Sequence, residues 1–333
     1  MGIKNREDLR NAINGHQLAR CLQVIAELGI ADLLVDGPKS PEYLARATQT
    51  QEDALFRLLR SAVSAGVFVY DEEGCFRLNE PAQWLCQDQD GSLRAMAVLA
   101  GQQHFPAWAH LPESIRTGRP AFDLLHGMSV WDYRSTRVGA GETFDAAMSA
   151  LAATFAGAVI AAYDFSGAHC VVDVGGGHGA FLVALLQRYT HLSGVLFDQA
   201  PAVARFSERL DCGLRERGAG VAGDFLAPLP AMGDIYVLQR VLHDWDEGMA
   251  IRILVNCRAA MKAGQKVLVV ERVMDATAPT TEAALADLLM LVMNGGRERT
   301  GADFRRLLEA SGLRLERVIP TQSVLSIVEG CVV

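Results

Sequence analysis

The sequence predicts an α/β protein in which a mostly helical N-terminal region precedes a doubly wound, mostly parallel β-sheet. From residue 169 onward, short apolar runs alternate with helical segments, which is the order of strands and helices in a parallel sheet. The stretch 171–180, Val-Val-Asp-Val-Gly-Gly-Gly-His-Gly-Ala, joins one strand to a helix through four glycines. A chain of 333 residues exceeds the usual size of one compact core. We therefore predict domains at residues 1–100, 101–165 and 166–333.

The N-terminal region has the pattern of helices followed by a β-hairpin. Residues 11–35 carry apolar side chains at helical spacing. The Ser-Pro-Glu sequence at 40–42 is a helix start, with an N-cap, a proline at the first helical position and an early acid. Another helix extends from about residue 51 to a stop at Gly66, and apolar runs within 67–78 flank a turn. Two helices and a hairpin in this order are typical of a winged helix.

The charge of this region disfavours the DNA binding that a winged helix suggests. Residues 1–100 contain ten Lys and Arg against fourteen Asp and Glu. A net charge of −4, from 10 − 14, does not supply the basic surface that phosphate binding requires. The alternative is that this apolar helical module packs against its twin in a homodimer.

Residues 101–165 are predicted to be a helical linker that also lines a substrate site. Prolines punctuate the segment, and aromatic and methionine side chains are dense within it. Trp131, Phe144 and Met148 are candidates for the wall around a flat apolar substrate, because Phe144 and Met148 lie four residues apart on one helix face. Ordinary core packing is the alternative for most of these side chains.

The C-terminal region alternates strands and helices, with antiparallel pairing expected at its last edge. Strands are predicted at 171–174, 194–197, 219–222, 234–238, 266–271, 314–318 and 324–328, with helices at about 179–189, 201–211, 247–262 and 301–312. In such sheets the ligand lies beyond the carboxyl ends of the parallel strands. The polar residues predicted at these ends are Asp173, Asp198, Asp224, His243 and Glu271.

The glycine-rich loop predicts a nucleotide-cofactor site. Gly175 and Gly177 allow the backbone to turn sharply and lie close to a ligand. Asp198, about twenty residues further on, is placed to hold ribose hydroxyls. Asp173 would repel a pyrophosphate but suits a cationic cofactor such as S-adenosylmethionine. The glycine spacing also fits a dinucleotide, so an NAD(P)-dependent oxidoreductase remains the alternative.

His243 is the candidate general base. An imidazole with an ordinary pKa near 6.5 accepts a proton at neutral pH, and a phenol is a far better nucleophile once it is deprotonated. Glu271, at the end of a strand, and Glu298, in Gly-Gly-Arg-Glu-Arg-Thr, are candidates to orient the ring from its other nitrogen. A divalent-metal cluster of His243, Asp244 and Asp246 is the alternative.

Composition restricts the class of partner and the compartment. A net charge of −8 argues against nucleic acid or an anionic membrane as the main partner. No uninterrupted apolar run approaches eighteen residues and the first ten residues are polar, so we expect neither a signal peptide nor a transmembrane helix, and a cytoplasmic location. The seven cysteines show no zinc spacing and are expected to be reduced, mostly buried thiols.

Five motifs resemble the small-molecule O-methyltransferases of the caffeic-acid and hydroxyindole type. They are Asp-Val-Gly-Gly-Gly-His-Gly at 173–179, Gly-Asp-Phe at 223–225, Leu-His-Asp-Trp-Asp at 242–246, Val-Glu at 270–271 and Gly-Gly-Arg-Glu-Arg-Thr at 295–300. The resemblance covers nearly the whole chain. It implies a winged-helix dimerisation domain and a Rossmann-like catalytic domain that binds S-adenosylmethionine without a metal. It also implies His243 as base, flanked by Glu271 and Glu298.

The resemblance further implies individual ligand contacts. Gly175 and Gly177 lie beside the cofactor, Asp198 on its ribose, and Asp224 and Phe225 around its adenine. Met148, Met290 and Asn294 lie near the substrate and the reacting methyl group, and Met293 is a further candidate on the substrate side. Where plant members carry a cofactor-contacting lysine, this chain has Gln239, with Arg240 beside it.

The chain also resembles bacterial enzymes that methylate polycyclic antibiotics such as phenazines and anthracyclines. Some of those relatives lack the histidine and methylate nitrogen, so His243 favours oxygen as the acceptor. The sequence therefore predicts methylation of a phenolic hydroxyl on a small polycyclic secondary metabolite. N-methylation of an aromatic heterocycle such as a phenazine is the alternative.

Overall fold

The structure, a computed structural model, describes residues 2–332 and divides into two compact units. The first comprises the residues through Ala109 together with Trp131–Ala150, and the second comprises His110–Val130 together with the residues from Leu151 onward. The helical segment that the sequence placed at 101–165 thus contributes to both units. The predicted boundaries at 100 and 165 stay a prediction.

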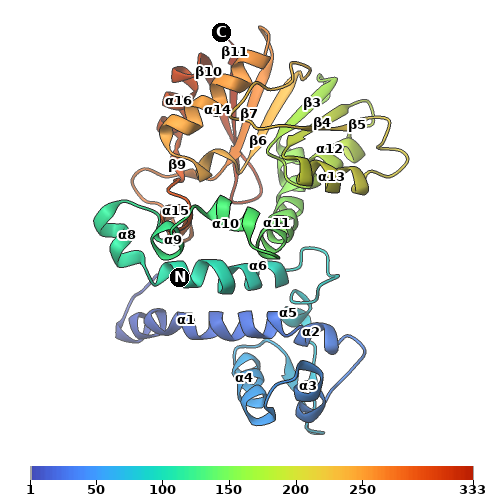
Figure 1. Cartoon of the computed structure of the whole chain (residues 1–333), viewed down its shortest axis with the longest axis vertical. Helices are drawn as coiled ribbons and strands as arrows, with labels where there is room; N and C mark the ends of the chain where they lie inside the picture. The colour runs from blue at the N-terminus through green and yellow to red at the C-terminus, as the bar shows by residue number, and fades with distance from the viewer. Residues whose placement is uncertain (1, 333) are drawn as a thin grey trace. The chain divides into compact units, whose positions relative to one another are not determined.

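The first unit begins with the expected helices and hairpin (Figure 1). Ser40 caps its helix, because the hydroxyl accepts a hydrogen bond from the backbone N–H of Tyr43 at 3.2 Å. Buried apolar side chains from all these elements form one core, which includes Ile25, Leu59 and Phe76. The elements are α1 (Arg6–Glu27), α2 (Ile30–Leu33), α3 (Pro41–Thr48), α4 (Glu52–Ser64), β1 (Val69–Tyr70), β2 (Phe76–Arg77) and α5 (Glu80–Gln83).

The remainder of the first unit is a segmented helix followed by two further helices. Its members are α6 (Arg94–Leu99), the π-helix η1 (Ala100–His104), α7 (Phe105–Trp108), most of α10 (Val130–Thr136) and the first part of α11 (Ala140–Ala162). η1 packs closely on α1, since a Cβ added at Gly101 would lie 1.9 Å from the Gln23 side chain. Only glycine allows this approach of the two helices.

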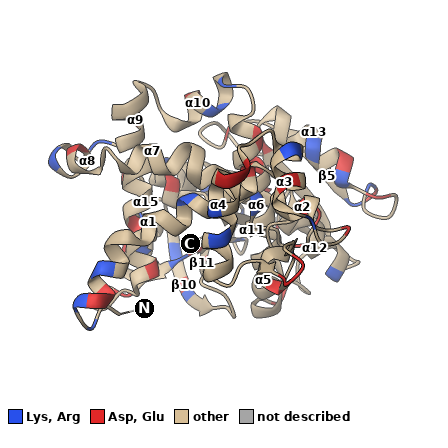
Figure 2. Ribbon diagram, turned by 90° about the horizontal axis from the view of Figure 1, so that it is seen from below, with Lys and Arg blue, Asp and Glu red and all other residues tan. Residues whose placement is uncertain are grey.

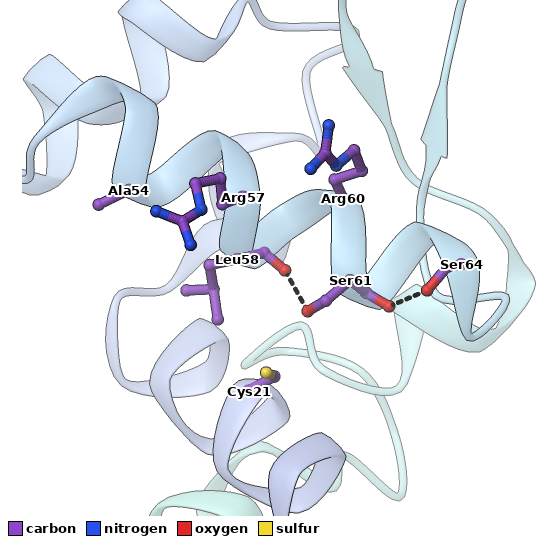
Figure 3. A pocket seen from close by; sticks show the side chains of 7 residues that line it. All are labelled: Cys21, Ala54, Arg57, Leu58, Arg60, Ser61 and Ser64. Atoms are coloured by element: carbon purple, nitrogen blue, oxygen red, sulfur yellow. Dashed lines mark hydrogen bonds between the residues drawn. The ribbon is translucent and has the colours of Figure 1, made fainter.

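An open pocket of about 670 Å³ lies between α1 and α4 (Figure 3). Its lining includes Cys21 from α1 and Arg57, Leu58 and Arg60 from α4. None of the predicted site residues lines it. Basic and acidic residues are interspersed along the helices of the chain (Figure 2).

The second unit contains a seven-stranded sheet with the order β10-β11-β7-β6-β3-β4-β5. The strands from β7 to β5 in this order pair in parallel, whereas β11 pairs antiparallel with both β7 and β10. This confirms the doubly wound sheet and the antiparallel edge. The strands are β3 (Cys170–Val174), β4 (Ser193–Asp198), β5 (Gly218–Ala222), β6 (Ile235–Gln239), β7 (Lys266–Glu271), β10 (Leu313–Pro320) and β11 (Ser326–Val332).

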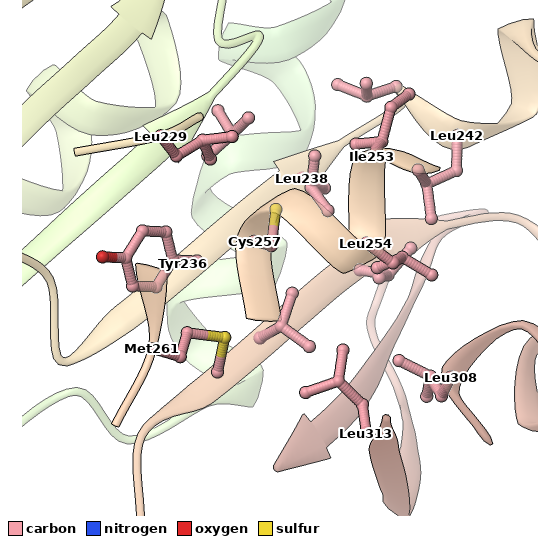
Figure 4. Close-up of a cluster of buried hydrophobic side chains, with 14 of the residues drawn as sticks. Leu229, Tyr236, Leu238, Leu242, Ile253, Leu254, Cys257, Met261, Leu308 and Leu313 are labelled. Atoms are coloured by element: carbon pink, nitrogen blue, oxygen red, sulfur yellow. The ribbon is translucent and has the colours of Figure 1, made fainter. Parts of the chain in front are cut away.

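Helices cover both faces of this sheet. α14 (Glu247–Ala260) and α16 (Gly301–Ala310) pack on one face, in the buried cluster around Tyr236 and Leu254 (Figure 4). The end of α11, with α12 (Ala180–Arg188) and α13 (Ala200–Arg209), covers the other face. Alternate residues of each central strand enter the two clusters, as burial on both sides requires.

Three further helices and one small sheet complete the second unit. α15 (Thr281–Met293), which packs against α8 (Leu111–Thr117) and α9 (Ala121–His126), was not predicted. Its sequence is apolar on most sides, so helical periodicity is weak within it. β8 (Val273–Met274) and β9 (Arg299–Thr300) pair in parallel and were not predicted either.

α11 is long and apolar enough to cross a bilayer by length and composition alone, with a mean hydropathy of 1.6, although no uninterrupted apolar run of that length occurs. Its residues Ala156, Val159 and Ile160 are buried in the core of the second unit, which accounts for part of that apolarity. The expectation of mostly buried cysteines was wrong, because only Cys86 and Cys257 are buried.

Candidate functional site

The glycine-rich loop follows β3 and precedes α12, as predicted. Gly177 adopts φ +59°, and a Cβ added there would meet no atom within 4 Å, so the loop borders open space at this point. At Gly176 an added Cβ would lie 2.2 Å from Oδ2 of Asp173. The backbone therefore passes directly over the Asp173 carboxylate, and only glycine leaves room for both.

Asp173 is a buried carboxylate near the end of β3. Its side chain is fully buried, and neither of its oxygens has a hydrogen-bond partner among the described residues. Burial, followed by the nearby charge of Asp198, raises the pKa of Asp173 to about 7. An unpaired buried carboxylate is costly. A ligand carrying a positive charge would remove that cost, so the site fits a cationic cofactor better than an anionic pyrophosphate.

Asp198 ends β4 and ties the loop to the neighbouring strand. Its Oδ2 accepts a hydrogen bond from the backbone N–H of Gly177 at 2.8 Å, and its Oδ1 accepts one from Gln199 at 2.6 Å. Each carboxylate oxygen has a second lone pair. Asp198 can therefore hold the loop and still accept hydrogen bonds from ribose hydroxyls.

Three further predicted cofactor residues lie at the carboxyl ends of two parallel strands: Asp224 and Phe225 follow β5, and Gln239 is the last residue of β6. Phe225 packs edge-to-face on Trp245 at 5.9 Å and borders the glycine loop, because a Cβ added at Gly175 would lie 3.4 Å from its ring. Asp224 accepts a hydrogen bond from the backbone N–H of Leu226. Both polar atoms of the Gln239 amide are buried and lack a partner among the described residues. These unpaired atoms are a second indication that this edge of the sheet receives a polar ligand.

His243 lies on a 3₁₀ turn (Leu242–Asp244) that follows β6. Between strand and turn, Arg240 adopts φ +54°, a left-handed conformation that is unfavourable for a side-chain-bearing residue. The Arg240 N–H donates to the carbonyl of Val270 at 3.0 Å, which holds this bend against β7. The apolar side chain of Leu242 is fully buried and anchors the turn in the core.

The imidazole of His243 is buried among three carboxylates. Its Nδ1 lies 3.1 Å from Oε1 of Glu298 and 3.7 Å from Oε2 of Glu271. Its Nε2 lies 3.7 Å from Oδ1 of Asp244. The structure thus brings together the three residues predicted to be catalytic, and it places both glutamates on the same ring nitrogen.

The protonation of this cluster differs from that of a free histidine. Burial lowers the pKa of His243, but the charges of Glu271 and Asp244 and the hydrogen bond to Glu298 outweigh burial and raise it to about 9. Burial acts in the opposite direction on a carboxylic acid, and it is the main cause that raises the pKa of Glu271 to about 7. The carboxylates thus favour the protonated imidazole, and the pKa of His243 lies above the ordinary value near 6.5 that the sequence prediction assumed.

The metal alternative placed His243 with Asp244 and Asp246. In the structure Asp246 caps α14, because its Oδ1 accepts from the backbone N–H of Met249 at 2.8 Å, and Asp244 accepts a hydrogen bond from the amide of Asn294 at 2.7 Å. Among the described residues, the acids whose ligand atoms gather with those of His243, within 4.8 Å of one another, are Glu271 and Glu298. The Nδ1 to Glu298 hydrogen bond explains the short spacing of that pair without an ion.

The predicted substrate residues of the second unit lie at the end of α15. Met290 and Met293 are buried, at 8% and 3% exposure. Asn294 follows the helix and connects it to the His243 turn through its hydrogen bond to Asp244. The side-chain Oδ1 of Asn294 accepts a hydrogen bond from the backbone N–H of Gly296 at 3.0 Å. Asn294 thus links the end of α15, which carries the two methionines, to the turn that carries His243.

The predicted substrate residues of the first unit form an aromatic pair. The Trp131 and Phe144 rings meet edge-to-face at 5.8 Å. The guanidinium of Arg134 lies 3.5 Å from the centre of the Phe144 ring, and its Nε donates to Gln103 at 3.0 Å. Met148, one turn further along α11, is partly buried. Arg134 was not predicted, although its spacing of three residues from Trp131 on a helix was a usable signal.

Comparison with known proteins identifies a family. The O-methyltransferase domain family matches residues 108–314, and the O-methyltransferase dimerisation domain family matches residues 11–88. Phenazine O-methyltransferase PhzM of Lysobacter antibioticus is 40% identical over 322 residues, which is 96% of this chain and 94% of that protein.

Two solved structures extend the comparison to the fold. The crystal structure of LaPhzM superposes with a TM-score of 0.96 and 39% identity, covering 99% of this chain and 100% of that one. An O-methyltransferase from neocarzinostatin biosynthesis, solved with S-adenosylmethionine and 2-hydroxy-5-methyl naphthoic acid, gives a TM-score of 0.83 and 34% identity, covering 95% of this chain and 96% of that one.

Proposed function

The chain belongs to the S-adenosylmethionine-dependent O-methyltransferases that act on small aromatic metabolites, and on that premise we propose that it methylates a phenolic hydroxyl of a polycyclic secondary metabolite. It is a homodimer through its N-terminal domain, whose residues 11–88 match the dimerisation family. We further propose that it works in the cytoplasm of an antibiotic-producing cell. The soluble biosynthetic enzymes among its relatives support this location.

The observation that carries the proposal is the buried, unpaired Asp173 beneath the glycine loop. S-adenosylmethionine is the cofactor of this family, and it supplies an electrophilic methyl group on a positively charged sulfur. In this chain the carboxylate of Asp173 would compensate the positive charge of the cofactor. The other residues proposed to hold it are Gly175, Gly177, Asp198, Asp224, Phe225, Gln239 and Met148.

His243 is proposed to receive the proton of the acceptor hydroxyl. To do so it must first be neutral, and the carboxylates oppose this because they raise its pKa to about 9. A positive charge nearby, such as that of the cofactor's sulfonium, would lower the pKa of the imidazole. The charges of Glu271 and Glu298 then stabilise the imidazolium that forms when the phenol is deprotonated, and the hydrogen bond between Nδ1 and Glu298 holds the ring. Base catalysis of this kind contributes about 10²–10⁴-fold.

The acceptor is proposed to be a flat aromatic of two or three rings. The side chains proposed to contact it are the ones that the sequence indicated, Trp131, Phe144, Met290, Met293 and Asn294. Apolar and aromatic surfaces with a few polar groups are the usual lining of such sites. The naphthoic acid bound to the neocarzinostatin enzyme and the phenazine named for the Lysobacter enzyme are aromatics of this size.

Product analysis tests the proposal. The enzyme is incubated with methyl-labelled S-adenosylmethionine and hydroxylated phenazines and naphthoates, and the products are identified by mass spectrometry and NMR. We expect label on a phenolic oxygen, and label only on a ring nitrogen would establish the N-methyltransferase alternative instead. Calorimetry with S-adenosylmethionine and with NAD(P) is the companion measurement. Saturable binding of NAD(P) alone would overturn the assignment.

A further inference from the structure

Arg299 is a buried cation that no function described so far uses. Its side chain is 2% exposed, and it forms no ion pair in the part of the chain that the structure describes. Burial lowers its pKa, while the charge of Glu271 acts in the opposite direction. Burying a guanidinium without a carboxylate partner is costly, so the residue calls for an explanation.

The guanidinium holds the backbone on both sides of His243. It donates to the carbonyl oxygen of Leu242 at 2.6 Å and to that of Trp245 at 2.8 Å. Leu242 comes immediately before His243, and Trp245 comes two residues after it. One rigid, planar group thus spans the 3₁₀ turn that carries the imidazole.

The same turn is held from its other side by Glu271. Oε1 of Glu271 accepts from the backbone N–H of Leu242 at 2.9 Å and from that of His243 at 3.3 Å. The carbonyl of His243 accepts from the backbone N–H of Arg297 at 2.8 Å. The donors of the turn therefore face the carboxylate, and its acceptors face the segment that contains Arg297 and Arg299. A small shift of either side would move the imidazole relative to Glu298.

Charge gives Arg299 a second effect on the same cluster. Two buried glutamates and one imidazole share this site, and their protons are coupled. The groups that act on this site by charge are Asp244, which raises the pKa of His243, and Arg240, which lowers the pKa of both His243 and Glu271. The charges of Arg299 and Glu271 also interact. The fixed positive charge of Arg299 therefore adds to that of Arg240: it favours the ionised carboxylates and opposes a second positive charge on His243. Lysine or arginine would each supply that charge, but only arginine reaches two carbonyls with one planar fork.

We propose that Arg299 is a positioning residue for the methyl transfer: it fixes the His243 turn against Glu271 and Glu298, and its charge helps to set the pH at which His243 releases its proton. The inference rests on the proposed function of His243 as base. It predicts that Arg299 acts on turnover and on its pH dependence, and leaves cofactor affinity nearly unchanged.

Two substitutions at this position separate geometry from charge. Arg299→Met removes both the two hydrogen bonds and the positive charge, and we expect kcat to fall at least 100-fold. The acid limb of the pH profile of kcat should move to higher pH, because loss of the cation raises the pKa of His243. Arg299→Lys keeps the charge, and we expect about a 10-fold lower kcat with the acid limb unmoved. Arg305→Met on the exposed face of α16 is the matched control. It should behave as wild type.

The measurements also distinguish failure of this inference from failure of the proposed function. Wild-type methylation of a phenol and S-adenosylmethionine affinity are established first, so absence of methylation in wild type would refute the proposed function alone. Wild-type kcat and pH profile in Arg299→Met would overturn the role of Arg299. If circular dichroism shows that Arg299→Met is unfolded, Arg299→Lys decides the matter. Undiminished kcat in that variant would refute the two-carbonyl clamp.

Discussion

Nδ1 of His243 and Oε1 of Glu298 lie 3.1 Å apart in a site where both side chains are more than 90% buried. Fifty-five positions separate these residues in the sequence. The pair fixes the orientation of the imidazole and leaves Nε2 as the nitrogen that is not bound to a glutamate. This arrangement is what a histidine base requires when the proton is to be accepted at Nε2.

Replacing His243 tests its role as base directly. His243→Ala should lower kcat by about 10²–10⁴-fold, the range for loss of a general base. The dissociation constant of S-adenosylmethionine, measured by calorimetry, should change less than 3-fold. Wild-type turnover in a folded variant would remove His243 from the mechanism.

Neutralising Glu271 should move the pH profile in a defined direction. The charge of Glu271 is the largest of the causes that raise the pKa of His243 to about 9. In Glu271→Gln that pKa falls, so the acid limb of kcat should move to lower pH. The measurement is kcat between pH 5 and 10. Glu282→Gln, an exposed acid on α15, serves as control, and an identical profile for Glu271→Gln and wild type would contradict the electrostatic assignment.

Asp173 should link cofactor binding to stability. Its pKa is about 7 when folded and near 3.8 when unfolded, so the folded protein disfavours the charged form. Asp173 should therefore contribute a loss of stability as pH rises from 4 to 7, and the stability of Asp173→Asn relative to that of wild type should increase over this range, while Glu271 contributes equally in both proteins. Thermal unfolding across this pH range measures the effect.

The same variant should lose cofactor affinity. Asp173→Asn removes the negative charge that is proposed to face the positive sulfur compound, and we expect at least 10-fold weaker binding of S-adenosylmethionine by calorimetry. Asp164→Asn, an exposed acid outside the sheet, is the control. Equal affinity in Asp173→Asn and wild type would show that the carboxylate does not face the cofactor.

The aromatic pair of the first unit should determine acceptor affinity. Phe144→Ala removes the partner of both Trp131 and Arg134, and we expect KM for the aromatic acceptor to rise about 10-fold or more, from loss of buried aromatic area. The affinity for S-adenosylmethionine should stay within 3-fold of wild type. Trp84→Ala, an exposed aromatic of the same unit, should leave KM unchanged.

Much of the fold was predictable because its signals are local. The N-cap at Ser40, the glycines at 175–179 and the apolar strand of β7 each follow from a few neighbouring residues. α15 was missed because a helix that is apolar on most sides has weak periodicity. β8 and β9 contain two residues each, too few for a period to show.

The sequence by itself determined the strands of the main sheet and most of the helices between them, the glycine-rich loop and the polar residues at the strand ends, because backbone conformation is encoded over short stretches. Only the tertiary structure decided that two glutamates share one nitrogen of His243, that Asp173 has no partner, and that Arg299 spans the turn. Those relations join residues far apart in the chain, and their effect on protonation depends on burial, which no spacing encodes.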